Sequence, residues 1–505
     1  MMKNEIILTT LNARYTHSSI GLRYLFANMQ ELQEDTEIHE FTINDNIQDV
    51  AEKLLAKKPA VIGLGVYIWN AEQCRELVVT LKKVCPEVVI VLGGPEVSYL
   101  PMRVQYDMVD YIIQGEGDLA FYQLIKAVFG GLSPKEQIIK AALPDIDMLA
   151  LPYDYYTDED VANRYIYVEA SRGCPFQCEF CLSSIDEKVR NFDTDLFLLA
   201  LEKLWLRGVR NFKFIDRTFN LNVNTASKLL DFFLAKPTPY FVHFEVIPDH
   251  FPEALKTRMT KFGATTLQLE IGIQTLNIDV AKNIHRNLKM KKIEENIAFL
   301  EHETSAHMHL DLIVGLPGED LASFGRGLNK LWAMSDSEIQ IGILKKLAGT
   351  TLHRHDEQYN MVYADQPPYD ILKNNMLSFE DIQKMKRFSR FWNLYYNSGN
   401  FKRSIAQLWQ DGDVYEQFFA YSLWVYEQTN STWKISLERL AELLFTYRTQ
   451  VQGADETEYA GTILSDIMKL EGRKVPNFLK PFAYDKTNFG QLSSSGHNKR
   501  QVRHL

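Results

Sequence analysis

The chain has 505 residues, 46% of them hydrophobic, and a formal net charge of -10 at pH 7. Single hydrophobic cores stop growing near ~250 to 300 residues, so this length predicts several domains. The acidic balance offers no basic stripe for a phosphate backbone, which disfavours nucleic acid as a partner. No apolar run approaches the roughly 18 residues that span a bilayer, and the first residues resemble a strand rather than a signal core. We therefore expect a cytoplasmic protein without membrane contact.

Residues 1–130 alternate short apolar runs with amphipathic stretches. Buried strands are expected at 6–10, 38–43, 60–66, 88–92 and 109–113, and helices at 20–32, 47–57, 71–84 and 118–128. Five strands joined by crossover helices predict an α/β domain with a doubly wound parallel sheet. The ligand crevice of such a sheet lies at the carboxyl ends of its strands.

A linker with three prolines is expected over residues 131–160, and a second α/β domain over residues 161–345. Six βα units are predicted there, with strands at 165–170, 211–215, 240–246, 266–271, 307–314 and 339–344. They indicate a partial (β/α)6 barrel, whose chemistry lies at the carboxyl ends of the strands.

Residues 346–490 read as a mainly helical domain, followed by a polar tail at 491–505. Ser378 and Asp381 have the spacing of a capping box and precede an amphipathic run, which predicts a helix start. Aromatic residues crowd the segment 415–426 at helical spacing. This pattern favours core packing over a surface for stacking a substrate.

Three of the five cysteines, Cys174, Cys178 and Cys181, lie together directly after the first predicted barrel strand. Such uneven use of cysteine disfavours a disulfide framework. Three thiolates can bind three irons of a four-iron cluster and leave one iron open. The alternative is structural zinc, which prefers four closed ligands, whereas Cys74 and Cys85 belong to the other α/β domain. We predict an iron-sulfur cluster.

Polar residues occupy positions on the barrel strands where an apolar strand would gain nothing from them. They are Asp216, Glu245, Glu270, Gln274 and Asp311. Buried carboxylates are costly unless they are paired or hydrogen-bonded, so together they indicate an organised polar site. Ordinary salt bridges or helix caps are the alternative for each one taken singly.

Two glycine pairs follow strands of the first sheet: Gly93 and Gly94 after the fourth, and Gly115 and Gly117 after the fifth. Glycine permits close approach of the backbone to a ligand at this edge. Ordinary turn chemistry is the alternative.

The cysteine triplet, with Phe180 before its last member, resembles the signature of radical S-adenosylmethionine enzymes. The resemblance implies a [4Fe-4S] cluster whose open iron chelates S-adenosyl-L-methionine, and a 5′-deoxyadenosyl radical formed by an electron from a donor such as flavodoxin or ferredoxin. The protein's part is to position the cofactor. We count Phe180 and Asp216 among the cofactor-binding candidates; catalytic residues cannot be assigned from the sequence.

Three further segments resemble strands of the coproporphyrinogen-oxidase-like and methylthiotransferase-like branches: 243–249, 270–274 and 311–317. By that resemblance Glu245, Gln274 and Asp311 line the S-adenosylmethionine pocket, and Arg286 pairs with the carboxylate of the cofactor. A guanidinium grips a carboxylate through two hydrogen bonds, as a lysine cannot. The alternative for Arg286 is a solvated charge at a helix end.

The glycine pairs ahead of such a barrel resemble the cobalamin-binding domain of cobalamin-dependent radical enzymes, and the three-part layout resembles an uncharacterised bacterial subfamily with a C-terminal helical domain. The Asp-x-His-x-x-Gly motif that supplies a histidine to cobalt is absent. Either the corrin binds without a protein ligand or the domain has lost it.

The resemblance implies transfer of a methyl group from methylcobalamin to an unactivated carbon, or a rearrangement, on a small-molecule or peptide substrate. A non-enzymatic corrinoid or redox sensor is the competing function.

Overall fold

The computed structural model describes residues 6–409 and 412–483. The predicted polar tail at 491–505 lies outside them. The chain divides into two compact units. The first runs from the first strand to Arg217 and includes Lys345–His353 and Tyr363–Asp370. The second holds Thr218–Leu344, Arg354–Val362 and the chain from Ile371 onward.

The first unit begins with a six-stranded parallel sheet in the order β2-β1-β3-β4-β5-β6. Its strands are β1 (Ile6–Asn12), β2 (Thr36–Thr42), β3 (Val61–Gly65), β4 (Val89–Gly93), β5 (Tyr111–Gln114) and β6 (Ile138–Lys140). The first five confirm the predicted strands. The sequence pattern missed β6 because three residues are too short a run to show a period.

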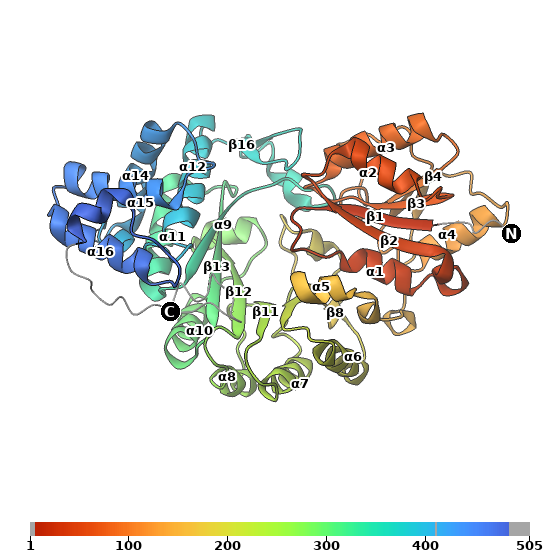
Figure 1. Cartoon of the computed structure of the whole chain (residues 1–505), viewed down its shortest axis with the longest axis horizontal. Helices are drawn as coiled ribbons and strands as arrows, with labels where there is room; N and C mark the ends of the chain where they lie inside the picture. Colours follow the sequence, from red (N-terminus) through yellow and green to blue (C-terminus); the bar gives the residue numbers. More distant parts are fainter. Residues whose placement is uncertain (1–5, 410–411, 484–505) are drawn as a thin grey trace. The chain divides into compact units, whose positions relative to one another are not determined.

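Helices cover both faces of this sheet (Figure 1). They are α1 (Ile20–Ala27), α2 (Ile47–Leu55), α3 (Ala71–Val84) and α4 (Ala120–Phe129). Successive residues of a strand point to opposite faces, and β1 accordingly divides between two cores. Ile7 packs into the core that holds the apolar residues of α2 and α3, whereas Ile6 and Leu8 pack into the core that holds those of α1 and α4. The doubly wound sheet predicted from the sequence is confirmed.

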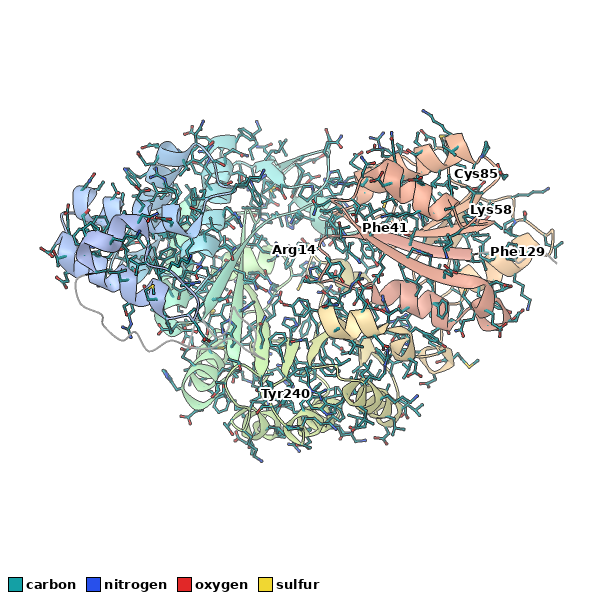
Figure 2. The ribbon with its side chains drawn as sticks, in the orientation of Figure 1. Arg14, Phe41, Lys58, Cys85, Phe129 and Tyr240 are labelled. Carbon is teal, nitrogen blue, oxygen red and sulfur yellow. The ribbon has the colours of Figure 1, made fainter. Side chains whose placement is uncertain are left out.

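The rest of the first unit carries the start of the second α/β domain. Its elements are α5 (Asp158–Asn163), β7 (Ile166–Val168), β8 (Ser171–Arg172), β9 (Arg190–Asn191), α6 (Thr194–Leu206) and β10 (Asn211–Phe214). Strands β7 and β10 pair in parallel, and β8 and β9 form an antiparallel pair around the cysteine segment. Cys85 lies at the end of α3, in the helical layer of the first sheet (Figure 2).

The second unit contains a run of parallel strands in the order β14-β13-β12-β11. They are β11 (Phe241–Val246), β12 (Leu267–Gln274), β13 (His307–Val314) and β14 (Glu338–Ile343). The helices of this part are α7 (Val223–Leu234), α8 (Glu253–Met259), α9 (Ile278–Asn283), α10 (Met290–Glu303) and α11 (Leu321–Met334). All six strands predicted for the barrel are present along the chain.

The C-terminal part is helical, as predicted. After two short strands, β15 (Val362–Tyr363) and β16 (Ile371–Lys373), come α12 (Phe379–Tyr395), α13 (Lys402–Ala406), α14 (Val414–Thr429), α15 (Leu437–Thr446) and α16 (Glu456–Met468). The capping box of Ser378 and Asp381 opens α12. Phe388 and Trp392 of α12 pack edge-on against Phe418 of α14, so the aromatic run forms core, as expected.

None of the helices in the described residues combines the length and the apolar character needed to cross a bilayer.

Candidate functional site

The cysteine loop starts from the β8–β9 pair. Gly173 has a φ of +90°, and a Cβ there would collide with the carbonyl of Lys188, so only glycine fits. The Cys174 N–H donates to the carbonyl of Asp186 at 3.0 Å, and the Cys181 N–H donates to the carbonyl of Cys178 at 3.0 Å. Backbone geometry therefore gathers the three cysteines in one short loop.

Cys174 and Cys178 are buried and Cys181 is half-buried. Burial raises the pKa of the Cys174 thiol, and the neighbouring Cys181 and Cys178 add to this, while Arg217 opposes it. Three thiolates leave one iron of a four-iron cluster open, whereas a structural zinc site takes four protein ligands.

Asp216 follows β10, and its carboxylate contacts the backbone and side chain at residues 170–171, just before the cysteine loop. Its carboxylate accepts hydrogen bonds from the Ala170 N–H at 3.0 Å and from the Ser171 hydroxyl at 2.6 Å. Burial raises the pKa of Asp216 to about 7, against these hydrogen bonds. Asp216 therefore holds the start of the loop. Phe180 is half-buried between Glu179 and Cys181.

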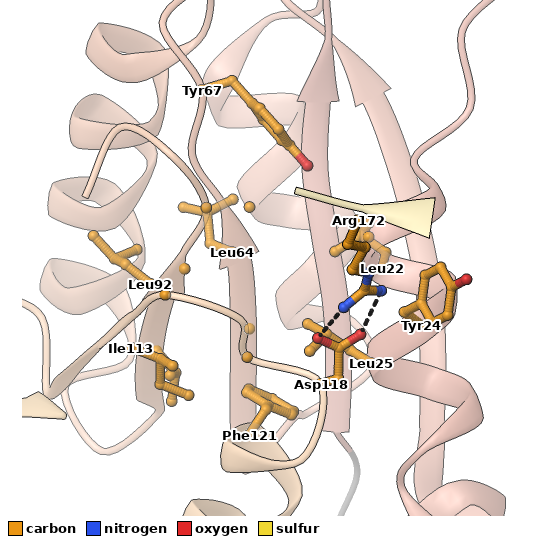
Figure 3. A pocket seen from close by; sticks show the side chains of 18 residues that line it. Leu22, Tyr24, Leu25, Leu64, Tyr67, Leu92, Ile113, Asp118, Phe121 and Arg172 are labelled. Carbon is orange, nitrogen blue, oxygen red and sulfur yellow. Dashed lines mark hydrogen bonds and ion pairs between the residues drawn. The ribbon is translucent and has the colours of Figure 1, made fainter. Parts of the chain in front are cut away.

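Arg172, which the sequence reasoning passed over, joins the cysteine loop to the first sheet. Its guanidinium lies 2.9 Å from Glu116, 3.0 Å from Asp118 and 2.8 Å from Glu169. The contact with Asp118 is marked in Figure 3. Glu116 and Asp118 belong to the second glycine loop. The signal was available, because Arg172 is the only cation in the segment 171–181.

The predicted glycines Gly93, Gly94, Gly115 and Gly117 line one cavity of about 180 Å³ at the carboxyl edge of the first sheet (Figure 3). Gly94 has a φ of +106°, and a Cβ there would lie 2.5 Å from the carbonyl oxygen of Val66. A Cβ at Gly93 would meet nothing within 4 Å. Gly94 is thus required by the fold, while Gly93 leaves open space in the cavity.

A larger cavity of about 600 Å³ lies between the β1–α1 loop and the cysteine loop. Tyr67 and Trp69, stacked with ring centroids 4.5 Å apart, line it, as do Glu116 and residues 171–173. His17 also lines it, with Nδ1 2.5 Å from the Tyr167 hydroxyl. Burial lowers the pKa of His17, and Lys213 and Arg14 add to this, which favours the neutral ring that contacts Tyr167.

The larger cavity has the volume of a typical ligand pocket, the glycines permit close approach of a ligand to the backbone, and the stacked aromatic pair offers an apolar surface. These features are compatible with a corrinoid. Both cavities belong to the first unit, and Tyr67, Arg172 and their neighbours contribute to each.

In the second unit, Glu245, Glu270 and Asp311 lie on one face of neighbouring strands. Glu245 is the register partner of Glu270, and Asp311 lies opposite Gly272 in β12. Burial raises the pKa of Asp311 well above its usual range, Glu270 and Glu245 raise it further, and Arg286 opposes them. The structure thus brings together three of the predicted strand residues and Arg286, although Asp311 lies within β13 and not at its end.

Gln274, at the end of β12, lines a cavity of about 470 Å³ together with Glu270 and Asp311. Arg286 follows α9, is half-buried, and donates to the carbonyl of Gly272 at 2.6 Å. This contact with the strand backbone disfavours the alternative that Arg286 is a solvated charge at a helix end. It leaves the guanidinium beside Asp311, where it can meet a carboxylate.

One wall of the same cavity comes from Lys386, Ser389, Arg390 and Asn393 of α12 and from Asn397, which follows this helix. Asn397 accepts from the Ile339 N–H at 2.9 Å and donates to the Ile339 carbonyl at 2.8 Å, which fixes the end of α12 against β14. The sequence predicted this helix but not the face that it turns to the cavity. The spacing of four residues between Lys386 and Arg390 was the available signal.

Three family descriptions match the chain: "B12 binding domain" over residues 6–125, "Radical SAM superfamily" over 168–330, and "Protein of unknown function (DUF4080)" over 357–502. The protein therefore combines a B12-binding domain with a radical S-adenosylmethionine domain, which confirms the predicted class and the predicted cofactor set at the level of domain families. The DUF4080 match covers most of the C-terminal helical part, including α12.

The chain is 27% identical over 239 residues to "Uncharacterized methyltransferase PH0819" of Pyrococcus horikoshii, covering 42% of this chain and 51% of that protein. It is 25% identical over 371 residues to "Cobalamin-dependent radical SAM methyltransferase TokK" of Streptomyces tokunonensis, covering 64% and 53%. The chain thus spans about half the length of these curated relatives.

The fold is similar to that of the cobalamin-dependent S-adenosylmethionine radical enzyme OxsB, with a TM-score of 0.60 at 11% identity, covering 92% of this chain and 78% of that chain. At this identity the likeness supports the fold alone.

Proposed function

We propose that the protein is a cobalamin-dependent radical S-adenosylmethionine enzyme that methylates a carbon of a small-molecule or peptide substrate. The single observation that carries the proposal is the ion-pair network that connects the cysteine loop with the second glycine loop of the B12-binding domain. Arg172 precedes the first cluster cysteine and binds Glu116 and Asp118 of the B12-binding domain. A charged hydrogen-bond network of this kind stabilises one arrangement of two loops, as a cofactor pair acting in one reaction requires.

In this proposal Cys174, Cys178 and Cys181 hold a [4Fe-4S] cluster, and the cavities at Gly93 and Tyr67 hold the corrin. When bound, the cluster, S-adenosylmethionine and cobalamin supply the radical and methyl-transfer chemistry. The protein's residues bind and orient these groups. The contact between His17 and Tyr167 supports binding of the corrin without a histidine ligand from the protein.

The cavity in the second unit is proposed to receive S-adenosylmethionine and substrate. Gln274, Asp311 and Arg286 are the residues assigned to the cofactor. Lys386 and Arg390 of α12 add cationic residues to the lining of the same cavity, which also includes Glu270 and Asp311. This mixture of charges suits a polar substrate, and it gives the DUF4080 region a role in choosing it.

The relatives named as methyltransferases favour methyl transfer over rearrangement. A corrinoid or redox sensor is the less favoured alternative, because a sensor has no need for the polar cavity lined by Gln274, Asp311 and α12. A cytoplasmic location and a flavodoxin or ferredoxin as electron donor are part of the proposal.

The test is anaerobic incubation of the reconstituted, reduced protein with cobalamin and methyl-labelled S-adenosylmethionine. We expect both 5′-deoxyadenosine and S-adenosylhomocysteine, because one product reports radical formation and the other reports methyl transfer. Formation of 5′-deoxyadenosine alone, in the presence of bound cobalamin, would favour a rearrangement. Absence of both products with an intact cluster would contradict an enzymatic function.

A further inference from the structure

A second group of ionisable side chains lies at the amino ends of two strands of the second unit. His307 opens β13, His309 follows two residues later, and Glu338 opens β14 as the register partner of His309. Residues two apart on a strand share a face, so the two imidazoles and the carboxylate lie on one side of the sheet. Neither the family matches nor the proposed reaction assigns them a role.

The three groups are close enough to share one ion. The Nε2 atom of His307 lies 3.0 Å from Oε1 of Glu338, and the Nε2 atom of His309 lies 3.5 Å from the same oxygen. All three ligand atoms lie within 4.8 Å of one another, which no other group of three achieves in the part of the chain that the structure describes. Bonds of about 2.0 to 2.1 Å at tetrahedral angles place ligand atoms about 3.3 Å apart, close to the distances found.

Hydrogen bonding inside the protein does not account for His309. Its Nε2 atom is buried and has no hydrogen-bond partner, since 3.5 Å to Glu338 is too long. Its Nδ1 atom faces two amide nitrogens, Gln340 Nε2 at 2.7 Å and Gln268 Nε2 at 3.2 Å, although one ring nitrogen can accept only one such donor well.

Turning the two amides resolves both problems. The nitrogen and oxygen of a glutamine amide are interchangeable in shape, so either side chain can present its oxygen to His309. Nδ1 then carries the proton and donates to that oxygen, and the lone pair of Nε2 points toward His307 and Glu338. A histidine that binds a metal through one nitrogen characteristically donates from the other in this way.

Glu338 is fully buried, with 0% of its side chain exposed, and buried carboxylates are found paired or coordinating metal ions. We propose that His307, His309 and Glu338 bind one divalent metal ion, and that the donor set of two imidazoles and a carboxylate selects zinc. The side chain of His307 is 11% exposed, which gives the ion a route in and a position for a water ligand. The ion ties the amino ends of β13 and β14, on the strands that carry Asp311 and Gln340. This site is independent of the proposed function.

The experiment measures zinc and iron in the full chain by mass spectrometry, after growth with added zinc and anaerobic reconstitution of the cluster. We expect one zinc per chain in addition to the cluster iron. His309→Ala and the conservative Glu338→Gln should each lose the zinc and keep the iron. The matched control is His302→Ala, since His302 lies at the end of α10 outside this group, and it should keep both.

Retained iron shows that the variants have folded, and melting provides a second measurement. Removing zinc with a chelator should lower the Tm of the wild-type protein but not that of Glu338→Gln, because an ion that binds only the folded state raises its stability. Two results would overturn the proposal. One is zinc that persists in both His309→Ala and Glu338→Gln but disappears in Cys178→Ala, which would place it at the cysteine loop. The other is a wild-type protein that neither contains zinc nor takes it up from a chromophoric competitor.

Discussion

Two cavities in this chain lie against parallel sheets, and their linings have opposite chemistry. The cavity of the first sheet is lined mainly by glycine and by apolar side chains such as Leu64 and Phe121, beside the Arg172–Asp118 ion pair. The cavity of the second unit is lined by Glu270, Gln274 and Asp311, with cationic residues from α12. The first site is shaped by the absence of side chains and the second by charged ones.

The difference follows from what each ligand demands of a protein. A large corrinoid is recognised by shape, so bare backbone at Gly93 and space beside it are sufficient. A charged cofactor such as S-adenosylmethionine needs fixed charges, and their burial costs stability. The raised pKa of Asp311 is a direct sign of that cost. In the proposed function, one parallel sheet therefore serves steric recognition and the other serves electrostatic recognition.

The largest effect is expected at the cysteine loop that accompanies the steric site. Cys178→Ala should abolish the visible absorption of the reconstituted cluster, because two thiolates cannot hold about four irons and four sulfides in place. Iron and sulfide analysis measures this. Cys85→Ala is the control, since Cys85 lies at the end of α3, and it should retain the full cluster. A complete cluster in Cys178→Ala would remove the basis of the assignment.

The steric nature of the first cavity is tested by Gly93→Val. A Cβ at Gly93 meets nothing within 4 Å, so the fold should tolerate the change while the new methyl groups occupy the space for the ligand. We expect cobalamin affinity to fall by about 100-fold, or about 2.8 kcal/mol, with an unchanged Tm. The control is Gly263→Val, which also meets nothing within 4 Å and lies outside the cavity. Equal cobalamin binding by both variants would show that the corrin does not use this cavity.

The electrostatic nature of the second cavity is tested by Arg286→Lys. The change keeps the charge but loses the forked donors, one of which holds the carbonyl of Gly272. Loss of a charged hydrogen bond is worth about 1.5 to 3 kcal/mol, so S-adenosylmethionine affinity should fall roughly tenfold to hundredfold with the cluster intact. Titration of the cofactor measures it, with Arg258→Lys as control, because Arg258 pairs with Asp231 and is absent from the lining of this cavity. Unchanged affinity would mean that Arg286 does not bind the cofactor.

The cost of the electrostatic site is tested by Asp311→Asn. Because burial and Glu270 raise the pKa of Asp311 in the folded protein, the native state binds the proton more tightly than the unfolded one. This carboxyl therefore destabilises the protein increasingly as the pH rises above the unfolded pKa of about 4. Asp311→Asn should remove that slope, about 1.4 kcal/mol per pH unit, and be more stable than wild type near pH 7.

Thermal unfolding between pH 5 and about 7 measures the slope, and the exposed Asp336→Asn should behave like wild type. The same Asp311 variant should bind S-adenosylmethionine more weakly. If the stability of wild type and of Asp311→Asn changed with pH in the same way, the pKa of Asp311 would not be raised in the folded protein.

The local pattern of the sequence predicted the strands of the two sheets and the cysteine loop, because strand periodicity, helix caps and cysteine spacing all depend on residues that are close in sequence. The capping box at Ser378 and the triplet ending at Cys181 are examples, and both stand where the sequence placed them. The strand β6 was missed because three residues carry no period.

Only the tertiary structure decided which distant residues meet. Arg172 binds Glu116 across 56 positions, α12 completes a cavity begun by Gln274, and His309 meets Glu338 through strand register. None of these pairs has a local signature. A salt bridge, a cavity wall or a metal site depends on which distant segments of the chain pack together. Burial in that packing then shifts the pKa of ionisable groups, as it does for Asp311.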